Sequence, residues 1–555
     1  MSQTTRPPRR EKVNLCFISA DPSSNNGKTS NLHMGHKALR TSYAAESTLE
    51  EFDTSDTSLS ESSLSSSLSG SKDSSPDVDL GILFETLEEK INALEAPEVL
   101  SLEDIESFNA TEFGGAELTG CFTAGGVDLY GIAPNILDPF QQYPHTSPLP
   151  SDLVSNANIY SLSVLWPGLL PPSPRASHPG INAWLESSAT HEALHSTLLF
   201  GSYSHRRTLW LVKNRGHFSN EDGKKLSLCE ADAIVRVNRA IQSPSGAVTD
   251  CIILCVLCMA TNKVDGPMWE QNQERIFQAP LTSLQWLDIY GRLSPHPVHQ
   301  AGLVQLVRLR GGLEKIELPG LAAIISYSSI LGASRSLSRP SFTFVSLRTG
   351  GFLGLQDIIG THIKPFQSNQ IPTHMQSILQ SQRIYVSEIE MYEDGVQIGT
   401  DLLCDHRNII QWHIMSLLPS IQLDSSHAIT YPLYESCRLA LIIFGVGVTF
   451  PLPPQSTPLK TLGRMLKLEL QSHNYETPDL SPSALDLYLW ILTLGCIAAT
   501  DSPERAWFID QLRVHIAYHG PSTWHGFRAE LKSILWLDSA CGMPGKIIWN
   551  DVMRS

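Results

Sequence analysis

Residues 299–342 read HQAGLVQLVRLRGGLEKIELPGLAAIISYSSILGASRSLSRPSF, and this stretch decides the fold. In its first part Leu303, Leu306 and Val307 follow i, i+3 and i+4 spacing, which places them on one face of a helix. The pair Gly311–Gly312 follows where a left-handed C-cap is needed, and glycine adopts that conformation without a Cβ penalty. The pattern therefore predicts a helix that ends at this pair.

A second helix is predicted after Pro319, because proline suits a first helical turn, where its missing N–H has no partner to lose. The apolar spacing then repeats at Leu321, Ile324, Ile325, Ser328 and Leu331. Two helices of this kind bury little surface alone, so they need other helices on both sides. The stretch predicts a helical hairpin inside a larger array, and it carries no evident chemistry.

The rest of the chain after residue 180 also reads as helix after helix, with no series of alternating strands. Residues 343–375, which contain TGGFLG and several prolines, are predicted to be a loop insertion. The prediction is an all-α fold, a large array of antiparallel helix pairs. Its helices are expected within 181–212, 228–242, 247–262, 437–448, 459–473, 481–499, 505–516 and 524–538.

Charge divides the 555-residue chain more sharply than its net value of −16 suggests. Residues 50–138 hold two Lys/Arg against twenty Asp/Glu, whereas residues 139–555 hold 31 against 33. No broad basic surface announces nucleic-acid binding. Two further features separate the N-terminal part of the chain from the rest: a serine-rich, low-complexity tract at 54–76 and ten prolines between 134 and 179. We expect a disordered N-terminal region (1–150), a Pro-rich linker (151–180) and a helical domain (181–555).

Acidic and large apolar residues interleave from residue 77 to residue 113. This composition is typical of activation segments that fold onto a partner groove, such as one on the transcription machinery or another regulator. Docking of the same helix back onto the helical domain is an equal alternative. The apolar stripe, which is the candidate activation segment, consists of Leu80, Leu83, Phe84, Leu87, Ile91 and Leu94.

The first residues are polar and contain a small basic cluster, Arg6, Arg9, Arg10 and Lys12. The cluster is a candidate nuclear import signal, and a solvated tail is the alternative. No apolar run reaches the roughly 20 residues that span a bilayer, so no membrane association is expected. Ten scattered cysteines indicate reduced thiols rather than a disulfide framework.

Two patterns look like chemistry. HEALH at 191–195 matches a zinc-peptidase motif, in which His191 and His195 would share a helix face and Glu192 would be the general base. Neither the spacing nor the extended motif supplies a third ligand. The second pattern, C-x3-C-x2-C at 251–258, has the spacing of the iron–sulfur loop of radical enzymes that use S-adenosylmethionine. It lies inside CIILCVLCMA, where cysteines behave as small buried hydrophobes. Neither pattern identifies an enzyme, and no catalytic residue, metal or cofactor is predicted.

Arg308 and Arg310 on the first helix of the hairpin could bind an anion. A structural salt bridge is the favoured interpretation.

The hairpin stretch resembles the signature region of fungal-specific transcription factor domains, in which a helix ends in RGGL and a second helix follows. HEALHSTLLFGSYSH, EADAIVRVNRAI, VTDCIILCVLCMA, ESCRLALIIF, LYLWILTLGCIAA, RAWFIDQL and FRAELKSILWLD are similar to other blocks of that family, in the same order. The resemblance covers roughly residues 180–550. It implies a regulatory domain that serves effector response and dimerisation, as homodimer or heterodimer, in regulators that often control metabolic gene clusters.

Many members of that family also carry a zinc cluster of six closely spaced cysteines, which this chain does not match. Only Cys16 and Cys121 precede Cys229, so direct DNA contact is not implied. The expectation is a nuclear transcriptional regulator rather than an enzyme. The alternatives are a zinc metallopeptidase built on HEALH and a helical co-regulator or scaffold that does not bind DNA.

Overall fold

The structure is a computed structural model. It describes residues 149–554 apart from 174–175, 214–216, 243–247, 263–273, 359–362, 364–365, 425–429 and 473–481. These described residues belong to one compact unit. They form helices and connecting loops, with a single isolated bridge between Ser173 and Ala176 and no strand. The predicted all-α fold is confirmed for this part of the chain.

The hairpin stretch forms helices α12 (Pro297–Arg310) and α13 (Leu321–Ser336). Gly311 (φ +100°, ψ 22°) is the left-handed C-cap of α12 that the sequence predicts, and Gly312 follows with φ +101° and ψ 173°. The predicted apolar face of α12 is buried, as is most of α13. A 3-10 turn, η3 (Leu313–Lys315), follows the glycine pair.

Pro319 differs from its prediction, because α13 begins two residues later and Gly320 is its N-cap with φ +80°. Glycine is needed at this point for two reasons. The left-handed φ disfavours other residues, and an added Cβ would lie 3.0 Å from the ring of His178 and 3.1 Å from Leu170. The sequence predicts Pro319 in the first turn of the helix, but Pro319 lies in the turn that precedes α13, and Gly320 sets where the helix begins.

Residues 151–180, predicted to be a linker, are largely helical, and this prediction is wrong. They contain α5 (Ser151–Tyr160), the π-helix η1 (Ser161–Leu165) and α6 (Trp166–Leu169). Leu153 and Trp166 are buried, and α5 packs on α8. The prolines led to the wrong prediction because they occupy positions where a helix tolerates proline. Pro150 lies just before α5, and Pro167 lies in the first turn of α6.

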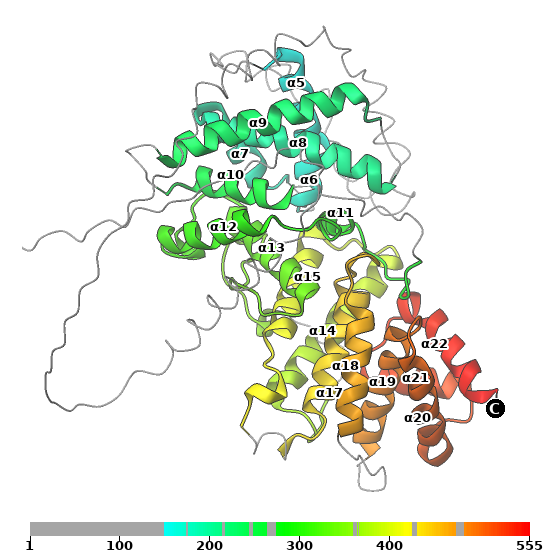
Figure 1. Ribbon diagram of the computed structural model, residues 1–555. Coiled ribbons are helices and arrows are strands. Elements are labelled where there is room, and N and C mark those ends of the chain that lie inside the picture. The colour runs from blue at the N-terminus through cyan, green and yellow to red at the C-terminus, as the bar shows by residue number, and fades with distance from the viewer. Residues whose placement is uncertain are drawn as a thin grey trace, which may run out of the picture. The chain divides into compact units, whose positions relative to one another are not determined.

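The next helices are arranged as successive packed neighbours (Figure 1). Helix α8 packs closely on α9, and α10 packs on both α8 and α12. The helical segment expected within residues 181–212 forms two helices, which are separated at His191. Their bounds are α7 (Pro179–Thr190), α8 (Glu192–Lys213), α9 (Asn220–Gln242) and α10 (Asp250–Thr261).

Short helical turns and two long helices make the middle of the chain. The described residues between 343 and 372 are irregular except for one 3-10 turn, as the predicted loop insertion requires. The helices of this part are η2 (Leu284–Trp286), α11 (Leu287–Tyr290), η4 (Leu355–Asp357), α14 (Thr373–Glu393), α15 (Thr400–Ser416) and η5 (Ser420–Gln422).

The C-terminal helices surround α19 (Pro482–Ala498), whose described side chains from Leu487 onward are buried. Helix α19 contacts α17, α18, α20, α21 and α22. Trp490 donates its indole N–H to the carbonyl of Leu535 at 2.6 Å. The surrounding helices are α17 (Tyr434–Phe444), η6 (Gly445–Thr449), α18 (Leu459–Ser472), α20 (Glu504–His519), α21 (Trp524–Ile534) and α22 (Asp538–Met553).

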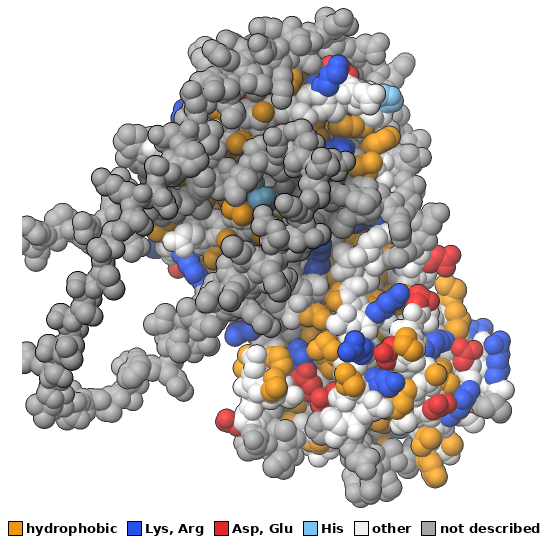
Figure 2. Space-filling view, viewed as in Figure 1, with side chains coloured by type: hydrophobic (Ala, Val, Ile, Leu, Met, Phe, Trp, Pro, Cys, Tyr) orange, Lys and Arg blue, Asp and Glu red, His pale blue; other side chains and the backbone are white. Residues whose placement is uncertain are grey.

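Two further findings concern membrane spans and surface charge. None of its helices is long and apolar enough to cross a bilayer. Over the C-terminal helices, the face seen in Figure 2 carries intermingled basic, acidic and hydrophobic side chains rather than a patch of one sign. The import cluster, the activation stripe and residues 1–148 of the predicted disordered region (1–150) lie outside the described residues.

Candidate functional site

The HEALH residues form a helix start rather than a metal site. His191 has extended backbone angles (φ −123°, ψ 98°), so it does not share a helix face with His195, contrary to the prediction. Its Nδ1 accepts a hydrogen bond from the N–H of Leu194 at 3.2 Å, and this caps α8. His195, on the first turn of α8, is buried.

The intended general base of that motif has a structural partner instead. Glu192 accepts a 2.7 Å hydrogen bond from the guanidinium of Arg236, and Arg236 also donates to Asp232. Asp232 in turn accepts from the hydroxyl of Ser196. This network ties α8 to α9. Among the described residues, no three His, Cys, Asp or Glu side chains lie close enough to hold a metal ion together.

The three cysteines of α10 are packing residues, as their sequence context indicates. Cys255 and Cys258 are buried, and Cys251 is half-buried. Burial raises the pKa of Cys258 to about 12, so its thiol stays protonated and poorly nucleophilic at neutral pH. Its Sγ–H donates to the carbonyl of Thr197 at 3.4 Å, which links α10 to α8.

Arg310 forms the structural salt bridge that the sequence favours. Its Nε donates to Asp250 at 2.8 Å, and the same carboxylate accepts the N–H groups of Glu317 and Leu318 at 2.7 and 2.8 Å. Asp250 is the first residue of α10, where a negative charge also suits the helix dipole. One carboxylate thus joins the start of α10, the end of α12 and the approach to α13.

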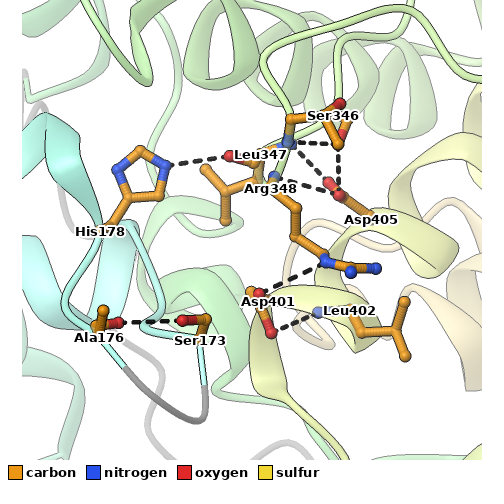
Figure 3. A network of polar contacts seen from close by, with 10 residues as sticks. Ser173, Ala176, His178, Ser346, Leu347, Arg348, Asp401, Leu402 and Asp405 are labelled. Atoms are coloured by element: carbon orange, nitrogen blue, oxygen red, sulfur yellow. Dashed lines mark hydrogen bonds and ion pairs between the residues drawn. The ribbon is translucent and has the colours of Figure 1, made fainter.

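Figure 3 shows a second polar network, which contains a serine, a histidine and an aspartate. Asp405 of α15 is buried and accepts from the Ser346 hydroxyl at 2.6 Å and from the N–H of Leu347 at 2.6 Å. Arg348 contributes a further N–H at 3.2 Å. His178 donates from Nε2 to the carbonyl of Leu347 at 3.0 Å.

This second network holds a loop and has no nucleophile. A hydrolytic triad needs the histidine between the serine and the carboxylate, but here Ser346 bonds Asp405 directly. His178 instead caps α7, since its Nδ1 accepts the N–H of Gly180 at 3.0 Å. Burial raises the pKa of Asp405 and lowers that of His178. The arrangement fastens residues 346–348 between α7 and α15.

A largely apolar cavity among η1, α6, α7, α8, α10, α11 and α13 is the candidate site. Its volume is about 70 Å³, which is room for about two waters or one small apolar group. Pockets for drug-sized ligands are several times larger. Aliphatic and aromatic side chains form most of its wall, including Trp166, Trp184, Leu198, Leu257, Tyr290 and Tyr327.

Tryptophans fix the wall of the cavity. Trp184 donates its indole N–H to the carbonyl of Pro319 at 3.0 Å, and its ring meets Trp166 edge to face at 6.1 Å. Trp286 donates to the carbonyl of Leu165 at 2.9 Å, which holds η1 against η2. Because Trp184 and Trp286 each donate the indole N–H to a carbonyl, these two rings are buried without an unsatisfied donor.

Asn262 and Arg335 are two of the polar side chains that line the cavity. Asn262, at the end of α10, is 5% exposed and uses its Nδ2 within its own helix end, at 3.0 Å from the carbonyl of Cys258. Its Oδ1 is buried without a hydrogen-bond partner. Arg335 of α13 donates to the carbonyl of Leu293, and burial lowers its pKa. The Oδ1 of Asn262 is therefore an open acceptor for a small molecule that carries a donor.

A buried histidine lies behind this wall. His205 of α8 is fully buried, with Nδ1 2.9 Å from the hydroxyl of Tyr160 and its ring 4.7 Å from that of Trp286. Burial, with a smaller contribution from the charge of Lys213, lowers the pKa of His205 to about 3. His205 is thus neutral at physiological pH. Its ring centroid lies 5.8 Å from that of Tyr290, which belongs to the cavity wall.

The chain has no match among protein families, curated proteins or solved structures. Sequence reasoning did not find the cavity, because its walls come from positions between 165 and 335 that share no motif. The one available signal was the mixture of tryptophan, small and polar residues on otherwise apolar helices. The candidate import and activation residues lie outside the described part of the chain.

Proposed function

We propose that this protein is a nuclear transcriptional regulator of the fungal-specific type rather than an enzyme. In this proposal an acidic, apolar segment contacts the transcription machinery or another regulator. The helical array regulates that contact and is the part that would form a homodimer or heterodimer. The basic cluster Arg6–Lys12 would direct nuclear import. The resemblance of the ordered helix blocks, above all residues 299–342, supports the assignment.

The composition of residues 77–113 is the single observation that carries the proposal. This segment holds eleven carboxylates and one lysine among regularly spaced leucine, isoleucine and phenylalanine residues. Such segments bind by laying an apolar helix face into a partner groove, and their charges speed association. No other segment of the chain combines charge and apolar residues in this way.

The helical array supports the proposal through what its ionisable groups do. Glu192, Asp250 and Asp405 each bind partners that join helices or loops, so none is free to act as a general base. The cavity could admit a small effector with a hydrogen-bond donor for Asn262. A larger effector would require α13 and Arg335 to move.

A reporter assay tests the activation part. Residues 50–140 fused to a heterologous DNA-binding domain should activate a reporter, and Leu83→Ser with Phe84→Ser should reduce that activity about tenfold by removing two apolar anchors. A matched control replaces two serines of the 54–76 tract with alanine and should change little. An inactive wild-type fusion would refute the activation segment.

Chromatin mapping tests the regulator itself. The tagged protein should be enriched at discrete promoters in the nucleus, and loss of the protein should change transcription of the neighbouring genes. Transcriptional effects without occupancy would instead indicate a co-regulator that does not bind chromatin. No observation favours the peptidase, and stoichiometric zinc in the purified protein would be the result that revives it.

A further inference from the structure

The helices α21 and α22 enclose an open groove of about 420 Å³ on the surface. Trp524 and Arg528, one turn apart on α21, form one wall. The other wall is a continuous stripe along α22: Asp538, Gly542, Met543, Lys546, Ile547 and Asn550. This volume falls in the range of ordinary ligand pockets.

The apolar side chains of this groove are unusually exposed. Met543 and Ile547, one helical turn apart, are 59% and 50% exposed. Single exposed hydrophobic residues are common, but two that line the same hollow beside a tryptophan mark an interaction surface. Gly542 keeps the hollow open, since an added Cβ there would meet no atom within 4 Å.

The polar side chains of the groove carry a positive excess. Arg528 binds Asp538 through two hydrogen bonds of 2.6 and 2.5 Å, which closes one end. Lys546 lines the groove and is exposed. The lining thus has two cations to one carboxylate. Lys532, which does not line the groove, pairs with Asp538 and with Glu390 of α14. Glu393 of α14 accepts a hydrogen bond from Ser539, which also lies outside the lining.

We propose that residues 87–113 of the same chain dock into this groove. Leu87, Ile91 and Leu94 fall at i, i+4 and i+7, which gives one apolar helix face. Eight carboxylates against one lysine in the segment complement the positive excess of the groove. The apolar face would cover Met543 and Ile547, and Glu88 or Glu95 would approach Lys546.

The length of the intervening chain permits this contact. Residue 149, the first that the structure describes, follows Leu94 by 55 positions. A chain of that length can extend to about 180 Å. A folded unit of about 400 residues has a radius of gyration near 21 Å. Tethering also gives the segment an effective concentration on the order of millimolar, so modest affinity suffices for occupancy.

Docking goes beyond the proposed function and has a consequence for it. A segment held in the groove would hide the same apolar face that binds a partner, so opening the groove would raise activation. Contact is measured without any reporter. Failure of docking therefore leaves the activation proposal standing, and an inactive reporter leaves docking standing.

Site-specific photo-crosslinking in the full-length chain tests the proposal. A photoreactive amino acid at position 547 should crosslink to peptides from residues 87–113, identified by mass spectrometry. The matched control places it at position 468, which is 56% exposed on α18. A 547 probe that reaches only other peptides, or a 468 probe that captures residues 87–113 equally well, would overturn the proposal.

Variants and isotope mixing complete the test. Ile91→Ser with Leu94→Ser should lower the yield from position 547 about tenfold, and Lys546→Glu about threefold. Circular dichroism melting should show that each variant folds. Mixing light and heavy chains separates crosslinks within a chain from those between copies. Crosslinks that are chiefly between copies would contradict docking within one chain.

Discussion

The cavity beside α10 and the groove between α21 and α22 are built from similar side chains with opposite results. Both contain tryptophan, aliphatic residues and an arginine. In the cavity Trp184 is buried and bonded to Pro319, and the space left is about 70 Å³. In the groove Met543 is more than half exposed above a hollow of about 420 Å³.

The difference shows how the surroundings of a tryptophan determine its role. Seven helical elements converge on the cavity, so its aromatic residues stabilise the fold and leave room only for a very small ligand. Only two helices form the groove, so its apolar side chains remain available. Affinity for a macromolecule should therefore reside in the groove, and fold stability in the cavity wall.

The largest expected effect comes from removing one tryptophan on each side of the comparison. Trp184→Ala should lower the free energy of unfolding by about 3–5 kcal/mol, because it opens a void and leaves the Pro319 carbonyl without its donor. Trp524→Ala should cost only about 1 kcal/mol, because Trp524 is partly exposed on the groove wall.

Denaturant unfolding of both variants measures this difference. Equal losses would contradict the division between a stabilising cavity wall and an available groove. Trp210→Ala, at a partly exposed ring of α8 that stacks on Phe218, is a control for loss of a tryptophan elsewhere.

The next effect is the pH dependence of stability that His205, behind the cavity wall, should cause. Because the pKa of His205 is about 3 when folded and near 6.5 when unfolded, the unfolded chain binds the proton first as pH falls. Stability is therefore present above pH 6.5 and should fall by about 1.4 kcal/mol for each pH unit between 6.5 and 3.

His205→Phe should remove this share of the slope, as measured by unfolding at pH 7.5 and 5.5. His178, His191 and His413 have pKa values lowered by burial, so they contribute a slope of the same sign that remains in the variant. An unchanged slope in His205→Phe would show that His205 is not neutral in the folded state.

A smaller effect is expected from replacing two helical glycines with alanine, and this pair of variants separates effects on stability from effects on binding. Gly332 of α13 lines the cavity and Gly542 of α22 lines the groove, and both have space for a Cβ. Alanine at either position should raise stability by about 0.5–1 kcal/mol, because glycine is costly within a helix. Only Gly542→Ala should also narrow the groove and reduce crosslinking from position 547.

The smallest effect is expected from the exposed groove residues. Met543→Ala and Ile547→Ala should each change the free energy of unfolding by less than about 0.5 kcal/mol, because most of each side chain is already in solvent. Thermal unfolding checks this. A loss above about 2 kcal/mol would mean that these side chains are part of the core.

Periodicity predicted much of the fold correctly. The i, i+3 and i+4 spacing and Gly311–Gly312 located the end of α12, and continuous apolar runs located α10 and α19. The failures share a cause, which is that packing outweighed local signals. Prolines concealed α5 and α6, and Gly542 with Pro544 concealed α22, which the sequence reading missed.

The candidate sites were predicted less well than the fold. A motif is local, whereas the cavity and the groove each join side chains from different helices. HEALH is a motif that matches in sequence but not in structure, because a helix boundary at His191 separates its two histidines. The salt bridge of Arg310 was predicted, because a charged side chain on such a helix commonly pairs with an opposite charge. Its partner, Asp250, was not predicted.

Hydrogen exchange in the full-length protein tests the central claim that residues 87–113 occupy the groove. We compare the wild type with Ile91→Ser/Leu94→Ser, variants that leave every described residue unchanged. If the segment docks, amides of α21 and α22 should exchange faster in the variant, whereas those of α18 should not change. Identical exchange of α21 and α22 in both proteins would contradict the account.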